Sequence, residues 1–226
     1  MAIPCGLLSG ESSSSPSYRA SLIKFRNRDI NNKVATAVPA NTNPFCATGS
    51  HLPNGSFAVF GGNSAVGLNG ANNDPGSTGA FDPLYQDHDG GQAIRIITPC
   101  TGDPTQAPCV WFDALNGPQM AVRRWYAGAE ALADGTVVII GGLTYGGYIN
   151  REYPNVDPAY EGGNAEPTYE FWPSNGNAPQ IMQFLIKTSG LNAYALTYLM
   201  PSGKMFVQAN YSTSYVTLLL GLDLIG

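Results

Sequence analysis

Three segments of this 226-residue chain repeat one pattern: a strand, a tight turn that ends in glycine, an apolar strand, and then small or polar residues. The turn glycines are Gly55, Gly135 and Gly203, which are 80 and 68 residues apart. Asn-Gly and Asp-Gly, found in the first two turns, are strong hairpin signals, because both central positions of the favoured two-residue turn need a positive φ. The third turn has the weaker Ser-Gly. The sequence therefore predicts three copies of one β-hairpin unit.

A recurring unit of about four strands is typical of a β-propeller, in which successive four-stranded sheets surround a central axis. The chain has 27 glycines and 17 prolines, as expected for many short strands joined by turns. No long stretch places apolar residues at the 3.6-residue period of a helix. We therefore predict an all-β fold that forms part of a β-propeller.

The repeats divide the chain into three parts. Residues 1–20 contain a serine-rich stretch and are predicted to be a flexible N-terminal segment. Residues 21–213 are predicted to form the partial propeller, and residues 214–226 an aberrant apolar tail that does not continue the repeat. Residues 21–40 would supply one or two strands of an incomplete first blade. Outer strands of the later blades are expected near 94–97, 110–112, 168–172 and 181–186.

Equivalent positions of successive repeats should become neighbours at the axis of a propeller. Nine residues before each turn glycine stand Cys46, Tyr126 and Tyr194. Cys46 and Tyr126 are therefore expected to point toward the same end of the axis. From residue type alone, a cysteine here would be a small buried apolar group and a tyrosine a packed ring with a satisfied hydroxyl.

The charge balance excludes some partners. Charged residues make up 12% of the chain and the formal net charge is −5, whereas nucleic acids and anionic membranes attract clustered Lys and Arg. Arg123 and Arg124 form the only tight basic pair, expected to be solvated or to stabilise a turn. The apolar tail is too short to cross a bilayer and carries Asp223. The N-terminus shows no recognisable signal peptide.

Four cysteines are present. Cys100 and Cys109 bracket a short, proline-rich loop that would suit a local disulfide, which would imply an oxidising compartment. Cys5 and Cys46 then remain.

Longer motifs carry a family resemblance. Residues 42–63, 123–135 and 166–173 resemble the N-terminal part of fungal glyoxal oxidase, one of the copper radical oxidases related to galactose oxidase. The hairpins that end in Gly-Gly also resemble Kelch-type blades. The likeness covers roughly residues 35–213. It implies that the chain holds the first two to three blades of a seven-bladed Kelch-type propeller, and that the protein is extracellular and monomeric when full length.

The resemblance also implies roles for particular residues. Cys46 matches a cysteine joined through a thioether to a radical-bearing tyrosine, and Tyr126 matches that tyrosine, which is also a copper ligand. Tyr145 is expected to stack over the pair, and Tyr194 matches no residue of known role. The implied cofactors are copper and the protein-derived Cys-Tyr radical. The implied reaction oxidises a small aldehyde or primary alcohol and reduces O2 to H2O2, with peroxidases as users of the peroxide.

The chain departs from the family in its remaining copper ligands. The family has a second, axial tyrosine followed by a histidine, and another histidine further on, whereas this sequence has no Tyr-His pair. Its two histidines, His51 and His88, match neither motif. The chain alone is therefore expected to be a truncated product without copper turnover. The alternative hypothesis is a non-catalytic Kelch-like binding or structural propeller, or a decayed paralogue.

Overall fold

The computed structural model describes residues 24–28, 35–66, 80–83, 86–99, 110–144, 164–188 and 192–218. In this part of the chain every named strand pairs antiparallel, and the only helix is α1 (Gln183–Lys187). The prediction of an all-β fold is confirmed. Residues 1–20, Tyr145, Cys100 and Cys109 lie outside the described residues.

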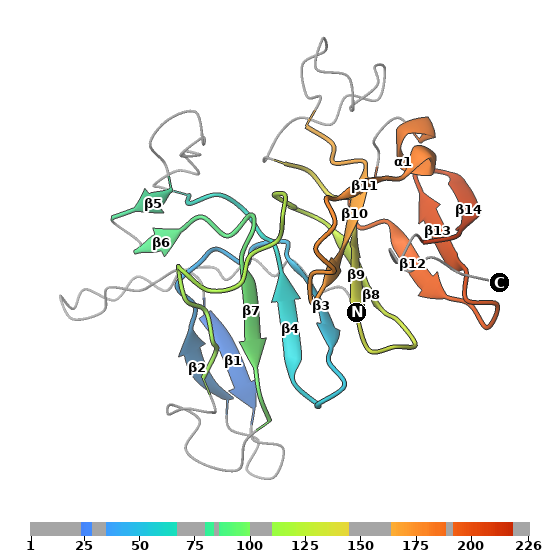
Figure 1. The fold of residues 1–226 in the computed structure, drawn as a ribbon. Helices are drawn as coiled ribbons and strands as arrows, with labels where there is room; N and C mark the ends of the chain where they lie inside the picture. Colours follow the sequence, from blue (N-terminus) through green and yellow to red (C-terminus); the bar gives the residue numbers. More distant parts are fainter. Residues whose placement is uncertain are drawn as a thin grey trace.

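Three sheets contain the three repeated hairpins. The first sheet has the order β3-β4-β7, the second β8-β9-β10-β11 and the third β12-β13-β14 (Figure 1). Two further sheets have two strands each, β1-β2 and β5-β6. The strands are β1 (Lys24–Arg28), β2 (Ala35–Pro39), β3 (Thr48–His51), β4 (Phe57–Phe60), β5 (Phe81–Asp82), β6 (Asp87–His88), β7 (Ile94–Ile97), β8 (Gly128–Ala131), β9 (Val137–Ile140), β10 (Thr168–Trp172), β11 (Gln180–Ile181), β12 (Leu196–Leu199), β13 (Met205–Ala209) and β14 (Ser212–Val216).

The first strand of each main sheet packs beside the first strand of the next, β3 beside β8 and β8 beside β12. The sheets stand side by side as an open array in Figure 1. This arrangement is that of part of a β-propeller, with β3, β8 and β12 as the inner strands. The pair β1-β2 fits the expectation of one or two strands in residues 21–40.

The three hairpin turns have the same geometry. In each, the turn glycine donates its N–H to the carbonyl three residues earlier: Gly55 to Leu52 (2.9 Å), Gly135 to Leu132 (3.0 Å) and Gly203 to Met200 (2.9 Å). In each, only the glycine of the turn has a positive φ, from 77° to 88°. These are three-residue loops, in which a turn is followed by a left-handed glycine.

The predicted two-residue turn, with positive φ at both central positions, was therefore wrong. The residue before each glycine plays a different part. Asn54 Oδ1 and Asp134 Oδ1 accept the N–H two residues on, from Ser56 (3.0 Å) and Thr136 (2.9 Å). Asn and Asp are favoured here because their side chains bond the local backbone.

Strand β9 lies between the other two sheets and is buried on both faces. Its side chains alternate: Val137 and Ile139 pack toward the first sheet with Phe60 and Ile94, whereas Val138 and Ile140 belong to the core shared with the third sheet. The continuous apolar run of this strand follows from that position, because alternate side chains face opposite sides of a sheet.

Two expected outer strands differ in the structure. The segment 181–186 leaves β11 at Ile181 and enters α1, since Met182 and Leu185, three residues apart, are both buried in one core. The segment 110–112 contributes one bridge, Phe112 to Ile96, rather than a strand. At the other end, β14 runs to Val216, so the predicted boundary between residues 213 and 214 falls inside this strand.

Gly61 and Gly62 allow the backbones of neighbouring repeats to approach closely. A Cβ on Gly61 would lie 2.1 Å from the carbonyl oxygen of Arg124, and one on Gly62 would lie 2.0 Å from that of Asn43. Gly62 donates its N–H to the Arg124 carbonyl at 3.1 Å. A side chain at either position would therefore push these backbone segments apart.

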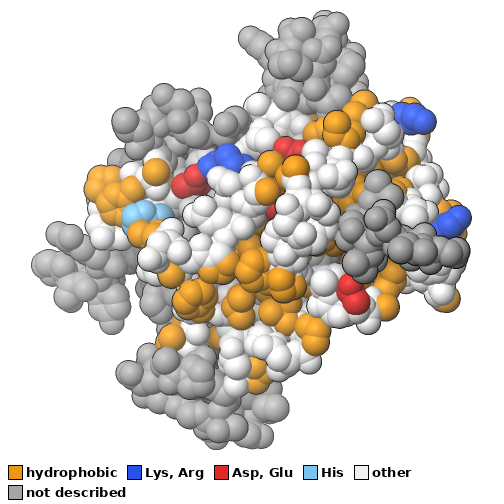
Figure 2. All heavy atoms as spheres, viewed as in Figure 1, with side chains coloured by type: hydrophobic (Ala, Val, Ile, Leu, Met, Phe, Trp, Pro, Cys, Tyr) orange, Lys and Arg blue, Asp and Glu red, His pale blue; other side chains and the backbone are white. Residues whose placement is uncertain are grey.

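The described surface carries few charges. Figure 2 shows one face of the molecule, on which Lys, Arg, Asp and Glu side chains are sparse and hydrophobic side chains gather over the middle. No helix among the described residues is long and apolar enough to cross a membrane.

Candidate functional site

The three residues that stand nine positions before the turn glycines adopt the same unusual backbone conformation. Cys46, Tyr126 and Tyr194 have φ values of 57°, 62° and 50°. Positive φ is uncommon for residues other than glycine and persists where surrounding contacts impose it. The repeat therefore reproduces one backbone geometry at three equivalent positions, each just before an inner strand.

These residues are joined by backbone hydrogen bonds. The N–H of Tyr126 donates to the carbonyl oxygen of Cys46 at 3.0 Å, and the N–H of Tyr194 donates to that of Tyr126 at 2.7 Å. The expectation that the three positions become neighbours is confirmed. A bond between the Cys46 sulfur and the Tyr126 ring is a separate matter and stays a prediction.

Two aromatic rings contact Tyr126 edge-on. The Trp125 ring lies at a centroid distance of 4.4 Å and an interplanar angle of 63°, and the Tyr194 ring at 4.9 Å and 73°. The indole Nε1 of Trp125 is buried without a hydrogen-bond partner among the described residues. Sequence reasoning missed the contact of Trp125, and it gave Tyr194 no family role but expected a packed ring, as its contact with Tyr126 shows. The expected cover, Tyr145, lies outside the described residues.

Cys46 is buried and its sulfur is in a disulfide whose partner lies outside the described residues. One sulfur cannot hold a disulfide and a thioether at the same time. The disulfide seen here therefore excludes the predicted thioether in the same molecule.

Tyr194 is held by polar contacts as well as by its ring. Its hydroxyl donates to the carbonyl oxygen of Ala47 at 3.3 Å. Burial raises the pKa of the Tyr194 hydroxyl to about 12, with a smaller contribution from neighbouring Tyr126. Tyr194 is therefore a neutral phenol at ordinary pH.

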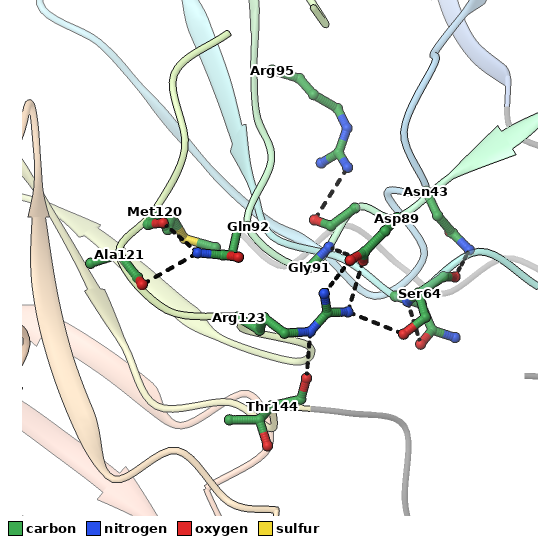
Figure 3. Close-up of polar contacts among 12 residues, drawn as sticks. Asn43, Ser64, Asp89, Gly91, Gln92, Arg95, Met120, Ala121, Arg123 and Thr144 are labelled. Carbon is green, nitrogen blue, oxygen red and sulfur yellow. Dashed lines mark hydrogen bonds and ion pairs between the residues drawn. The ribbon is translucent and has the colours of Figure 1, made fainter. Parts of the chain in front are cut away.

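Arg123 anchors the segment that leads to Tyr126 (Figure 3). Its guanidinium pairs with both carboxylate oxygens of Asp89, and it donates to Ser64 Oγ at 3.1 Å and to the carbonyl oxygen of Thr144 at 3.1 Å. A bidentate guanidinium–carboxylate pair fixes orientation as well as distance. Of the two roles expected for the basic pair, the structure shows the stabilising one.

The described residues do not complete a copper site. They contain no group of three His, Cys, Asp or Glu side chains that could hold a metal ion. Each histidine instead packs against a cross-strand aromatic partner, His51 on Phe57 and His88 on Phe81. Tyr126 is the one residue of the expected copper ligand set in this part of the structure.

Comparison with known proteins gives two plant relatives. The chain is 24% identical over 185 residues to "Aldehyde oxidase GLOX" of Vitis pseudoreticulata, covering 80% of this chain and 26% of the relative. It is 25% identical over 182 residues to "Aldehyde oxidase GLOX1" of Arabidopsis thaliana, covering 80% of this chain and 22% of the relative. The chain thus spans about a quarter of the length of these curated relatives. No family model matches the chain. The similarities support a distant relationship to glyoxal oxidase-like oxidoreductases.

Proposed function

We propose that this chain is part of an extracellular copper radical oxidase that oxidises small aldehydes or primary alcohols with O2 and releases H2O2. In this proposal Cys46 and Tyr126 form the redox-active pair, and a thioether joins them. The similarity to two plant aldehyde oxidases over 80% of the chain supports an oxidase. The observation that carries the site is the 3.0 Å hydrogen bond from Tyr126 N–H to Cys46 O, which makes the two residues neighbours.

The proposed cross-link is a two-electron oxidation. A carbon–sulfur bond forms between Cys46 Sγ and a ring carbon of Tyr126, while the S–H and one ring C–H bond are lost. The two electrons and two protons pass to O2, which becomes H2O2. Sulfur on the ring donates electron density and makes the phenol easier to oxidise. Copper, when bound, would supply the second redox partner for the substrate.

The protein contributes position and a partly dry environment. The backbone hydrogen bonds hold Cys46 and Tyr126 in the left-handed conformation, and the rings of Trp125 and Tyr194 flank the Tyr126 ring. Further copper ligands would come from parts of a longer protein that the described residues do not include. A peroxide-consuming peroxidase would be a natural neighbour of such an enzyme.

The Cys46 disulfide favours a second candidate, a non-catalytic Kelch-like binding or structural propeller. In that case the Cys46 disulfide stabilises the chain just before the first sheet, and the Tyr126 ring serves only in packing. An extracellular location suits both candidates, because disulfides persist in oxidising compartments.

A tryptic peptide map distinguishes the two. The chain is reduced, freed of reductant, exposed to Cu(II) and O2, digested, and analysed under reducing conditions. Cleavage after Lys33, Arg95, Arg124 and Arg151 gives peptides 34–95, with Cys46 as its only cysteine, and 125–151, which has none. A thioether joins these peptides into a product about two hydrogens lighter than their sum, and reductant does not separate it.

Cys46→Ser and Tyr126→Phe are the controls, and both should abolish the linked product. Fragment spectra should place the link on Tyr126 rather than on Tyr145 or Tyr148 of the same peptide. Peptides that run separately from the unsubstituted chain would contradict the redox pair and favour the binding propeller.

A further inference from the structure

Tyr194 belongs to the third repeat, but three of its contacts reach into the first two. Its N–H donates to the Tyr126 carbonyl at 2.7 Å, its ring meets the Tyr126 ring at 4.9 Å, and its hydroxyl donates to the Ala47 carbonyl at 3.3 Å. Ala47 follows Cys46 directly. A single side chain therefore contacts Tyr126 and the residue next to Cys46.

We propose that Tyr194 is the positioning residue of the redox pair: it holds the Cys46–Ala47 segment against Tyr126 so that sulfur and ring stay within bonding range. This inference rests on the proposed function and assigns a role that the resemblance does not give. Bond formation between two side chains is fast only when they spend much of their time in reactive geometry, and small displacements slow it strongly.

The backbone around the pair needs such support. Cys46 and Tyr126 both have positive φ, a strained conformation for a residue other than glycine that persists only when neighbouring contacts impose it. Tyr194 supplies one such contact to each residue's segment: its N–H forms a hydrogen bond with the Tyr126 carbonyl, and its hydroxyl forms one with the Ala47 carbonyl. Removing the Tyr194 side chain would keep the main-chain hydrogen bond to Tyr126 but lose the hydrogen bond to the Ala47 carbonyl.

Tyr194 is also poorly suited to be oxidised in place of Tyr126. A phenol that loses an electron must also lose its proton, and the group that accepts the Tyr194 hydroxyl is an amide carbonyl, a very weak base. Burial already raises the pKa of this hydroxyl to about 12. The arrangement therefore keeps Tyr194 as a neutral hydrogen-bond donor beside the tyrosine that reacts.

The test measures the rate at which linked peptide 34–95/125–151 forms in the full chain, divided by the folded fraction from urea unfolding. Tyr194→Phe keeps the ring and loses the hydroxyl bond, and Tyr194→Leu loses both. We expect Tyr194→Phe to slow linkage about 3-fold to 10-fold and Tyr194→Leu more than 10-fold. The matched controls are Tyr198→Phe and Tyr198→Leu, at an exposed position of β12, the strand that follows Tyr194, and they should stay within about 2-fold. Linkage by Tyr194→Leu at the unsubstituted rate would overturn the proposal.

A second readout separates this inference from the proposed function. In chain labelled with ring-13C tyrosine, the Tyr126 signal is assigned with Tyr126→Phe and followed by NMR. Loss of the neighbouring ring in Tyr194→Leu should shift that signal, and Tyr198→Leu should not. If the unsubstituted chain forms no linked peptide, the proposed function fails. A Tyr126 signal unchanged in Tyr194→Leu would overturn the positioning role whether or not the link forms.

Discussion

The guanidinium of Arg124 is fully buried, and its Nε donates a 2.8 Å hydrogen bond to a carboxylate oxygen of Glu170 on β10. The other carboxylate oxygen of Glu170 accepts the N–H of Ala121 at 2.6 Å. Burial lowers the pKa of the Arg124 guanidinium, and the neighbouring carboxylate partly offsets this. The pair therefore fixes the segment 121–126, which carries Tyr126, to the middle of the second sheet.

Replacing Glu170 with alanine should destabilise the chain by about 3–5 kcal/mol, because it leaves the buried Arg124 charge without its carboxylate. Urea unfolding followed by circular dichroism measures the change. Asp134→Ala is the control: its carboxylate is exposed on the second hairpin turn and should cost about 1 kcal/mol or less. Equal losses in the two variants would mean that the Arg124 pair does not hold the sheet.

Asp87→Asn should flatten the dependence of stability on pH. Burial, the largest cause, raises the pKa of Asp87 from 3.8 to about 7, with a further contribution from Asp82. Because the unfolded chain ionises first, the free energy of unfolding should fall between about pH 4 and pH 7 in the unsubstituted chain. At pH 8 the Asp87→Asn variant, whose amide oxygen can still accept from Asn43 and Val66, should be more stable than the unsubstituted chain by on the order of 1–2 kcal/mol.

Urea unfolding of both proteins from pH 4 to pH 8 checks this. The control is Asp134→Asn, because the pKa of Asp134 is lowered by hydrogen bonds to Thr136 and its removal relieves no buried charge. Parallel pH profiles for the unsubstituted chain and Asp87→Asn would show that Asp87 does not carry the effect.

Gly61→Ala should destabilise the chain by at least about 3 kcal/mol. The left-handed φ of 72° costs about 1–2 kcal/mol for alanine, and the new Cβ would lie 2.1 Å from the Arg124 carbonyl, which forces the repeats apart. Gly203→Ala isolates the first cost, since Gly203 has a similar φ of 77° with no atom within 4 Å. The midpoint of thermal unfolding of Gly61→Ala should therefore be well below that of Gly203→Ala. The reverse order would argue against close contact between the repeats.

The outer face of the third sheet should promote self-association. Tyr198 and Tyr215 are 56% and 61% exposed and flank Phe206 at ring distances of 6.3 and 5.7 Å. An exposed aromatic cluster on an uncovered sheet is an aggregation hazard. The double variant Tyr198→Ser/Tyr215→Ser should reduce the apparent mass in light scattering at high concentration. No change in mass would mean that this face does not mediate association.

The purified chain should not produce H2O2 from glyoxal or methylglyoxal at a sustained rate when copper is added. Tyr126 is the one residue of the expected ligand set among the described residues, and the two histidines pack against Phe57 and Phe81. A peroxidase-coupled dye assay measures the rate, with free Cu(II) as the background. Robust turnover above that background would refute this expectation.

The equivalence of positions in successive repeats could be predicted from the sequence, because residues at the same offset from the turn glycine occupy equivalent places in a propeller. Counting back from the turn glycines was enough to predict that Cys46, Tyr126 and Tyr194 meet.

Other features depended on contacts that no local pattern specifies. The Asn-Gly and Asp-Gly pairs did not distinguish a two-residue turn from the three-residue loop that forms, in which only the glycine has a positive φ. Helix α1 forms because Met182 and Leu185 fill a core that the second and third sheets share. The edge-on contact of Trp125 with Tyr126 is set by the packing of the folded chain, although the two residues are adjacent in sequence.

The hydrogen bonds that join Cys46, Tyr126 and Tyr194 through their main chains use only N–H and carbonyl groups. This main-chain part of the frame does not require particular side chains, although the Tyr194 ring and hydroxyl add contacts of their own. Each repeat offers one such interchangeable position. A change of a single codon could replace a phenol by an imidazole or a thiol there and keep these main-chain hydrogen bonds, so the side-chain chemistry presented at the axis can diverge faster than the fold.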